Sequence, residues 1–319
     1  KDVQKKFVRE LSKIPEFGGG LRHKNPEFSA RDRINRAPKA LGFVNLDSIA
    51  LTSAGERFLD DDLAGEAILR QLLKFQLPSP FHKANPRIRK TFCIRPYLEI
   101  LRLVHDLGRL AFDELQLFGM QLTDWHEFGA TVEAVRKFRV EKEKNKGRYK
   151  KFIATKRAKV ITCLYAREIK EGRIKTRESN KATLDKFIQT KVGNLRDYAD
   201  ACLRYLRATG LVTVSTPGRT ISIIESRRDE VAHILKTVDR DPVFVTDQKA
   251  YCQHLFDADA LELCYFRCDN GDVGALVPCP SVWHGCQIRA VRLQDYPVQR
   301  DLLYALRQGC LLEGYHTAD

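Results

Sequence analysis

No apolar run in this chain of 319 residues reaches the ~18–20 residues that a membrane-spanning helix needs. The start at Lys1 carries no charged segment followed by an apolar one, so we expect no secretory signal and a fragment or trimmed chain. An even cysteine framework is also missing, because nine cysteines are present and Cys93, Cys163 and Cys202 stand singly in apolar patterns. These absences disfavour secreted and membrane proteins and indicate free thiols in the cytoplasm.

Acidic residues are scarce relative to basic ones. The chain has 55 Lys and Arg against 41 Asp and Glu, which gives a net charge of +14. Residues 241–319 hold 6 basic and 11 acidic residues, so the first 240 residues carry a surplus of 19 positive charges. A basic body with a mildly acidic end indicates a polyanionic partner, with nucleic acid first. Charge kept for solubility is the alternative.

The order of predicted elements indicates a mainly α (α+β) protein with tandem winged-helix-like subdomains, short β-hairpin wings and a helical connecting region. Residues 1–75 form the first predicted subdomain. A helix that begins near Ser29 should end or kink at Pro38. Strands are predicted at 41–44 and 49–52, and a capping-box pattern from Ser53 to Glu56 precedes another helix.

Residues 76–96 hold four of the twelve prolines and several basic residues, which predicts a linker that cannot be one long helix. Residues 97–178 should be mainly helical, with Pro96 opening the first helix and Gly108 ending it. From Arg139 to Lys191 we count 18 Lys and Arg against 6 Asp and Glu. Such a density of like charges favours a nearby anion, and a solvated basic helix is the alternative.

Residues 179–240 repeat the first pattern. Leu195, Ala199, Cys202 and Leu206 follow helical spacing and predict a buried stripe. Gly210 should cap that helix, and strands are predicted at 211–214 and 220–224 around a type II turn at 216–219. Residues 241–319 differ in charge and are read as a small cysteine-rich unit or the start of a connection to another domain.

Two winged units suggest that exposed helix residues meet the edges of DNA bases. Arginine can bind guanine through two hydrogen bonds, asparagine can do so for adenine, and aspartate can accept from cytosine or orient an arginine. In the first subdomain and the linker the candidates are Lys24, Arg31, Asp32, Arg33, Asn35, Arg36, Lys39, His82 and Lys83. In the second they are Lys191, Asn194, Arg196, Asp197, Arg204, Arg207 and, at the wing tip, Arg219. Surface ion pairs around Asp32 and an intrahelical chain from Arg196 through Asp200 to Arg204 are the alternatives.

Three blocks of the sequence resemble AlwI-type type IIS restriction and nicking endonucleases. The first is Phe28–Ile34 with Gly42–Val44, and the second is Leu72–Gln76 with Pro78, Ser79, His82 and Lys83. The third and most specific runs from Thr190 to Leu211. The resemblance implies a winged-helix region, within residues 1–235, that reads a short asymmetric site in double-stranded DNA. It also implies prokaryotic origin and gives Arg31, Asp32, Arg33, Lys191, Asn194, Arg196 and Arg204 a role in binding or its scaffold.

In this family a C-terminal nuclease of the PD-(D/E)xK kind cuts outside the recognised site, and a second subunit or copy can serve double-strand cleavage. Such a nuclease needs acids and a lysine around a divalent ion. The local match Glu168-Ile169-Lys170 lies in a predicted helix without an upstream Pro-Asp pair. We therefore expect no catalytic residue or cofactor in these residues and Mg²⁺ in a nuclease domain outside them. A nuclease that uses Glu168 and Lys170 is one alternative, and a tandem winged-helix regulator that binds a palindrome is the other.

Zinc is a further alternative at the cysteine-rich end. Cys264, Cys268, Cys279 and Cys286 are separated by 3, 10 and 6 residues, with His284 nearby. Zinc sites usually pair cysteines two to four residues apart, and the second pair is wider than that. Buried free cysteines are therefore the preferred interpretation there.

Overall fold

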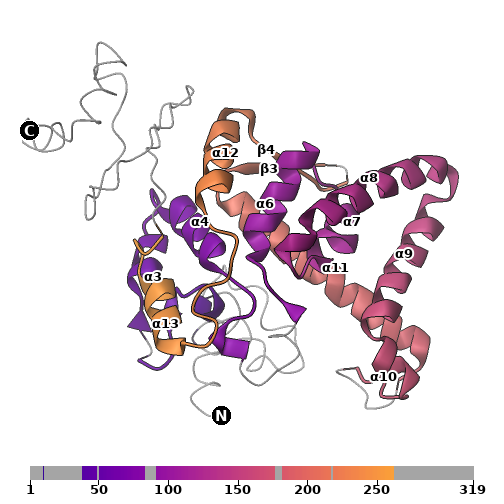
Figure 1. Cartoon of the computed structure of the whole chain (residues 1–319), viewed down its shortest axis with the longest axis horizontal. Helices are drawn as coiled ribbons and strands as arrows, with labels where there is room; N and C mark the ends of the chain where they lie inside the picture. Colours follow the sequence, from indigo (N-terminus) through magenta and orange to yellow (C-terminus); the bar gives the residue numbers. More distant parts are fainter. Residues whose placement is uncertain are drawn as a thin grey trace, which may run out of the picture. The chain divides into compact units, whose positions relative to one another are not determined.

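The computed structural model describes residues 38–48, 50–82, 91–176, 182–216 and 218–261, together with Glu10. It is mainly helical, with two small antiparallel sheets, as the composition and periodicity predicted (Figure 1). The chain divides into two compact units. Among the described residues, unit 1 combines the segments up to residue 82 with Pro242–Leu261, and unit 2 runs from Thr91 to Asp241.

Unit 1 begins with a short hairpin and continues in helices. Strand β1 (Val44–Asn45) pairs with β2 (Ala50–Leu51), so that Val44 faces Leu51. Helices α3 (Ser53–Phe58), α4 (Ala64–Lys74), the 3₁₀ turn η1 (Pro80–His82) and α13 (Gln248–Phe256) complete it. The N-cap of α3 is Thr52 rather than Ser53, because the Thr52 hydroxyl accepts from the Gly55 amide at 3.0 Å.

Residues 38–40 are helical, and the segment before Pro38 lies outside the described residues, so the predicted end or kink at Pro38 stays a prediction. The helix stops at Gly42, which has a φ of +77°. The Phe43 amide donates to the Pro38 carbonyl at 2.8 Å and the Gly42 amide to the Lys39 carbonyl at 3.0 Å. These two bonds form a Schellman motif, which favours glycine at its left-handed position.

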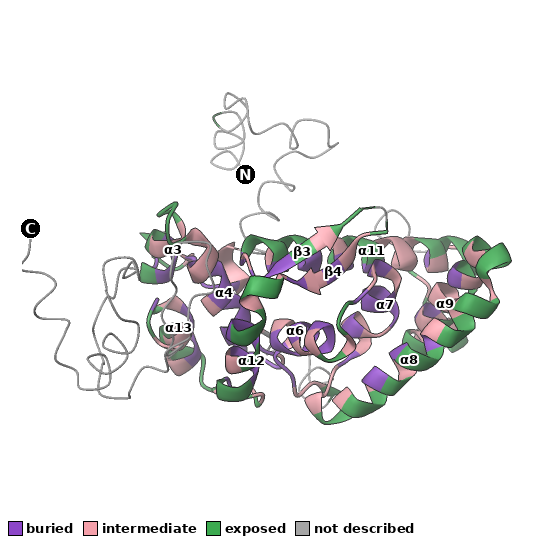
Figure 2. Ribbon diagram, turned by 90° about the horizontal axis from the view of Figure 1, so that it is seen from above, coloured by how far each residue is buried: buried purple, intermediate pink, exposed green. Residues whose placement is uncertain are grey.

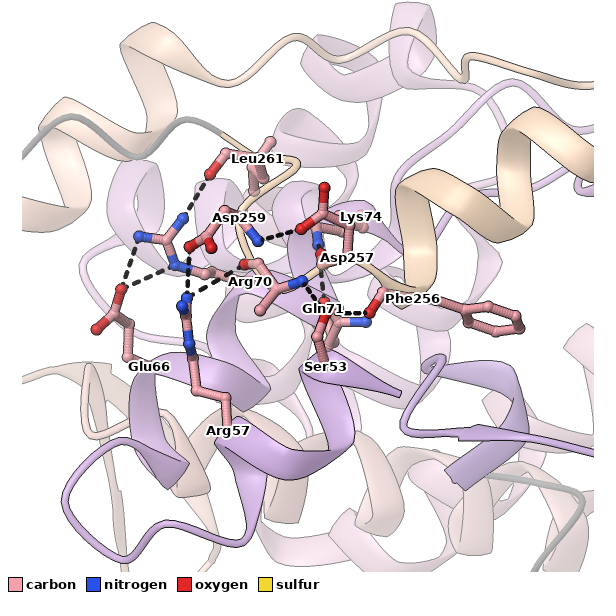
Figure 3. Close-up of polar contacts among 11 residues, drawn as sticks. Ser53, Arg57, Glu66, Arg70, Gln71, Lys74, Phe256, Asp257, Asp259 and Leu261 are labelled. Atoms are coloured by element: carbon pink, nitrogen blue, oxygen red, sulfur yellow. Dashed lines mark hydrogen bonds and ion pairs between the residues drawn. The ribbon is translucent and has the colours of Figure 1, made fainter. Parts of the chain in front are cut away.

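Polar side chains of α3 and α4 hold the chain that follows α13 (Figure 3). Arg57 pairs with Asp259 at 2.8 Å, and Arg70 donates to the Leu261 carbonyl at 2.5 Å. Lys74 is fully buried and its ammonium donates to Gln71 Oε1 at 3.0 Å and to the Asp257 carbonyl at 2.5 Å. The backbone carbonyls left free at the end of α13 thus find donors inside unit 1.

The two compact units divide the chain differently from the predicted domains, which stay predictions. Residues 242–261 pack into unit 1, and residues 262–319 lie outside the described residues. The buried side-chain amide of Gln76 binds both backbone groups of Val243. It accepts from the Val243 N–H at 2.8 Å and donates to the Val243 carbonyl. Both described ends of the predicted linker are also packed, because Gln76, Ser79, Ile94 and Arg95 are buried.

Helix α6 (Pro96–Leu107) lies at the centre of unit 2, and its colours in Figure 2 are largely those of buried and intermediate residues. Pro96 opens α6 and Gly108, at a φ of +74°, ends it, so both predicted boundaries are confirmed. The other helices are α7 (Phe112–Leu117), α8 (Phe128–Lys144), α9 (Tyr149–Leu164), α10 (Ala166–Lys170), α11 (Leu184–Ala208) and α12 (Arg228–Thr237). The 3₁₀ turns are η2 (Gly119–Gln121), η3 (Trp125–Glu127), η4 (Lys146–Arg148) and η5 (Glu225–Arg227).

A second hairpin follows α11. Strand β3 (Val212–Ser215) pairs antiparallel with β4 (Thr220–Ile223), close to the predicted bounds. Leu110, between α6 and α7, adds a bridge to the hairpin, because its N–H and carbonyl both bond with Ile221 at 2.9 Å. This pairing joins residues 111 positions apart and carries α7 against α11.

Ion pairs in which the carboxylate is buried hold the helices of unit 2 together. The guanidinium of Arg240 binds both oxygens of the buried Glu99, at 2.8 and 2.5 Å, and lies 4.4 Å from the Trp125 ring centre. Arg139 binds both oxygens of the buried Glu114 in the same way, at 2.8 and 2.9 Å. Bidentate geometry of this kind is specific to arginine, since lysine offers only a point charge.

We predict that Arg240→Ala lowers the free energy of unfolding by about 3–5 kcal/mol, because it leaves Glu99 charged and buried without its partner. Denaturant titration measures the change. Arg228→Ala is the matched control, since Arg228 pairs with Glu225 at the exposed start of α12. The control should change stability little, and equal losses in both variants would contradict the assignment.

Lys74 should make the stability of unit 1 depend on pH. Burial lowers the pKa of Lys74 to about 8, below its ordinary value near 10.5. Between these values the unfolded chain binds the proton and the folded chain does not, so stability rises with pH. From pH 7.5 to 9.5 we expect a gain on the order of 2 kcal/mol.

Lys74→Met should flatten this rise, because methionine has no proton to lose. Lys249→Met, at an exposed position of α13, should keep it. The measurement is the unfolding free energy of the three proteins across that pH range. A slope that is the same in Lys74→Met and the unaltered chain would show that another group titrates.

Candidate nucleic-acid interface

Most candidates of the first subdomain lie outside the described residues. These are Lys24, Arg31, Asp32, Arg33, Asn35, Arg36 and, in the linker, Lys83. The backbone of His82 ends η1, and its side chain is not described. Lys39 is half-buried, with its ammonium 5.6 Å from the centre of the Phe81 ring. Lys39 is thus the candidate of unit 1 whose side chain lies among the described residues.

Helix α11 carries the candidates of the second subdomain. Its apolar stripe is buried as predicted, and Phe187 and Leu203 extend it. The stripe packs against α7, α9 and β3, and the Thr183 hydroxyl caps the first turn by accepting from the Lys186 amide at 3.3 Å. The exposed residues among the candidates on the remaining surface are Asn194, Arg196, Asp197, Arg204 and Arg207. Burial of one side therefore fixes which side chains face solvent.

An open polar depression lies between α11 and the β3–β4 hairpin. It is lined by Gly193, Arg196, Asp197, Asp200 and Arg219. Gly193 contributes no side chain, and a Cβ placed there would meet no atom within 4 Å. Two arginines and two aspartates thus meet at a surface where the helix and the hairpin come together.

Asp200 neutralises two arginines at this depression. Its carboxylate lies 2.6 Å from Arg219 and 3.2 Å from Arg204. The intrahelical pair with Arg204 was foreseen as an alternative, whereas the pair with Arg219 joins the helix to the hairpin. Arg196 and Arg207 make no ion pair with any described residue, and neither does the exposed Lys186 in the first turn, so these cationic side chains of α11 are left for a ligand.

Arg219 is not a free wing-tip side chain. Its guanidinium lies 3.5 Å from the centre of the Phe112 ring, at the start of α7. Gly218 has the positive φ, +101°, that the predicted turn requires, but Arg219 also takes a φ of +49°, which is uncommon outside glycine. This conformation directs the arginine back toward α7 and α11, where it stacks and pairs.

Two further residues of α11 bear on the candidate surface. The ammonium of Lys191 lies 4.7 Å from the Tyr165 ring centre and 5.3 Å from that of Phe187, so it packs on these two rings. Tyr198, which the sequence analysis did not name, has a side chain that is 55% exposed. Its position one turn after Asn194 and off the apolar stripe is the sequence signal for that exposure.

The basic stretch from Arg139 to Lys191 is partly neutralised within unit 2. Arg139 and Arg157 bind the buried or half-buried carboxylates of Glu114 and Asp113. Lys146 and Lys156 pair with Glu143 and Glu141 of α8, and Arg167 pairs with Glu171 after α10. In α8, η4 and α9 the exposed basic residues that pair with no described carboxylate are Lys137, Lys144, Arg148, Lys150, Lys151 and Lys159, and Lys170, Lys175 and Lys186 follow later in the stretch. The helical hairpin of α8 and α9 therefore keeps a smaller cationic surface than its composition suggests.

The same hairpin is anchored by an apolar cluster. Leu117 from α7, Phe138 from α8 and Ile153 from α9 form its buried centre, with Phe118 and Phe152 packed against them. Glu168 and Lys170 follow in α10, so this local match to a nuclease motif lies on a helix, as predicted. They do not stand on a strand beside a second acid, which is where a PD-(D/E)xK site would place them.

Comparison with known families gives the class of protein to which the chain belongs. The chain belongs to the AlwI restriction endonuclease family, whose model matches residues 39–265. Membership in a restriction endonuclease family implies DNA as the substrate. Comparison with curated protein sequences yields no significant match. Within the described ranges, every helix is too short or too polar to cross a bilayer.

We predict that Asp200→Asn strengthens binding of duplex DNA at low salt, because it releases Arg204 and Arg219. The slope of log affinity against log salt should steepen by about 0.9 for each arginine that reaches a phosphate. Fluorescence anisotropy at several salt concentrations measures it. Asp197→Asn removes the same charge from the same helix without releasing an ion-paired arginine among the described residues, so its slope should stay unchanged. Equal effects of the two variants would contradict the role of Asp200.

Proposed function

We propose that unit 2 reads a short asymmetric site in double-stranded DNA as the recognition region of a type IIS restriction or nicking endonuclease. The observation that carries the proposal is the arrangement of α11, its exposed arginines and the β3–β4 hairpin on one surface. In this proposal Mg²⁺-dependent cleavage, outside the read site, belongs to a nuclease domain beyond the described residues. A second subunit or a second copy would then supply the cut in the other strand.

The order of elements in unit 2 supports a winged-helix assignment. A winged helix follows the order helix, strand, helix, helix and a two-stranded wing. Helix α6, the bridging Leu110, α7, α11 and the β3–β4 hairpin follow this order, and Leu110 pairs with β4 as a third strand would. Helices α8, α9 and α10 are then an insertion between the second and third helices. This assignment differs from the sequence-based one, which began the second winged unit at residue 179.

In this arrangement α11 is the helix that enters the major groove. The groove admits one α-helix, and side chains on its exposed side reach the base edges. Arg196, Arg207 and Asn194 are exposed there, and each can bind a base or a phosphate. Arg204 and Arg219 are held by Asp200, so they position the wing until DNA competes for them.

Selection of bound sequences from random duplexes tests the function. We expect one enriched, non-palindromic site, because a single copy of unit 2 offers one helix and one wing. An enriched palindrome would instead favour a dimeric regulator, since two-fold proteins read two-fold sites. No enrichment at all would overturn the proposal.

The variant Arg196→Ala distinguishes contact with a DNA base from general electrostatic attraction to DNA. If Arg196 contacts a base, its loss should cost about 1–3 kcal/mol on the selected site and relax preference at one position. Lys137→Ala on α8 is the matched control, because this exposed lysine lies away from the depression. It should weaken all duplexes alike, mainly through the salt slope. An Arg196→Ala variant with unchanged affinity and preference would remove α11 from the reading surface.

A further inference from the structure

Three side chains that can bind a metal ion converge in unit 2, away from α11. The ligand atoms of Cys93, Asp124 and His126 all lie within 4.8 Å of one another. They are a thiol, a carboxylate and an imidazole, and no prediction from the sequence placed a site here. The cluster draws on two segments of the chain, one before α6 and one before α8.

Backbone pairing holds the two segments together. Cys93 and Asp124 form a parallel bridge, in which the Cys93 amide donates to the Thr123 carbonyl at 2.9 Å. The Trp125 amide returns a bond to the Cys93 carbonyl at 3.0 Å. The thiol and the carboxylate are thus set side by side by main-chain geometry, which makes the arrangement independent of flexible side chains.

The orientation of His126 suits metal binding. Asp124 Oδ1 accepts from the His126 amide at 3.0 Å and from ring Nδ1 at 2.6 Å. An ionised carboxylate only accepts, so Nδ1 carries the proton in this hydrogen bond. An ion held by Asp124 would replace that proton and bind Nδ1, which lies 2.6 Å from the carboxylate oxygen.

Asp241 lies beside the cluster and is the nearest candidate for a fourth ligand. Its Oδ1 lies 4.0 Å from Cys93 Sγ and accepts from Trp125 Nε1 at 2.7 Å. It stands outside the three ligand atoms that lie within 4.8 Å of one another, so its side chain would have to turn toward them to complete a tetrahedral site. The neighbouring cation Arg240 is already bound to Glu99.

The ligand types indicate which metal would bind. Thiolate and imidazole suit zinc and similar transition metals, whereas Mg²⁺ takes oxygen ligands in octahedral geometry. A Mg²⁺ ion that serves phosphodiester cleavage would therefore not prefer this cluster. The side chain of His126 is 61% exposed and that of Asp124 40%, so an ion can enter from solvent.

We propose that Cys93, Asp124 and His126, with Asp241 as the fourth ligand, form a structural site for Zn²⁺. The chain enters unit 2 at Thr91 and leaves it at Asp241, so the ion would tie together both ends of the unit and the turn before α8. The simpler explanation is that Asp124 only caps η3, whose His126 amide it holds. That explanation requires no contribution from Cys93 or Asp241.

Titration of the full chain with Co²⁺, as a spectroscopic substitute for Zn²⁺, tests the site. We expect one equivalent that gives the near-ultraviolet absorption of a cobalt–thiolate bond and that Zn²⁺ displaces. Cys93→Ser should lose this absorption, and Cys163→Ser, at an exposed cysteine of α9, should retain it. His126→Gln is the second variant and should weaken Co²⁺ binding at least tenfold without removing the thiol.

Thermal unfolding gives an independent readout. Stoichiometric Zn²⁺ should raise the melting temperature of the unaltered chain and of Cys163→Ser, but not that of Cys93→Ser. The proposal is overturned if the unaltered chain shows no cobalt–thiolate absorption. It is equally overturned if the absorption survives in Cys93→Ser and is lost on replacing Cys264 and Cys268, which would assign the metal to the C-terminal cysteines.

Discussion

The burial of one side of α11 is the constraint on which the rest of unit 2 depends. Leu195, Ala199 and Cys202 pack inward against α7, α9 and β3, so the rotation of the helix about its axis is set. Arg196 and Arg207 are exposed as a consequence of that rotation. A helix that presents arginines in a defined direction needs an apolar stripe that cannot slip, because one residue of rotation would turn them by ~100°.

Sequence reasoning predicted this helix well and its partners poorly. The stripe, the Gly210 cap and the β3–β4 hairpin follow from local periodicity and turn chemistry, which the chain carries within a few residues. The bridge from Leu110 to Ile221 and the stacking of Arg219 on Phe112 join distant segments. No periodicity encodes such pairings, so an arginine predicted at a free wing tip is in fact held by Phe112 and Asp200.

Unit 1 also shows that pairings between distant segments cannot be predicted from local sequence. Leu72–Gln76 was singled out for its resemblance to a DNA-reading family, yet Lys74 and Gln76 are buried and hold residues 243 and 257. Their polar ends satisfy backbone groups that lie 167 and 183 positions away, and a single sequence cannot reveal such pairings. Part of the family resemblance therefore lies in residues that stabilise the fold. Sequence similarity alone does not distinguish such residues from those that contact DNA.

The distinction between stabilising residues and contact residues also applies to the basic side chains that make up the net charge. Arg139, Arg157 and Arg240 each bind a buried or half-buried carboxylate, and Arg219 stacks on a ring, so these four cations hold helices together. A polyanion gains little from charges that are already paired and desolvated. The exposed and unpaired cations of unit 2 therefore include those of α11 and the exposed lysines of α8 and α9. Electrostatic attraction would come mostly from the inserted helical hairpin, while any reading of bases would fall to the few unpaired side chains of α11.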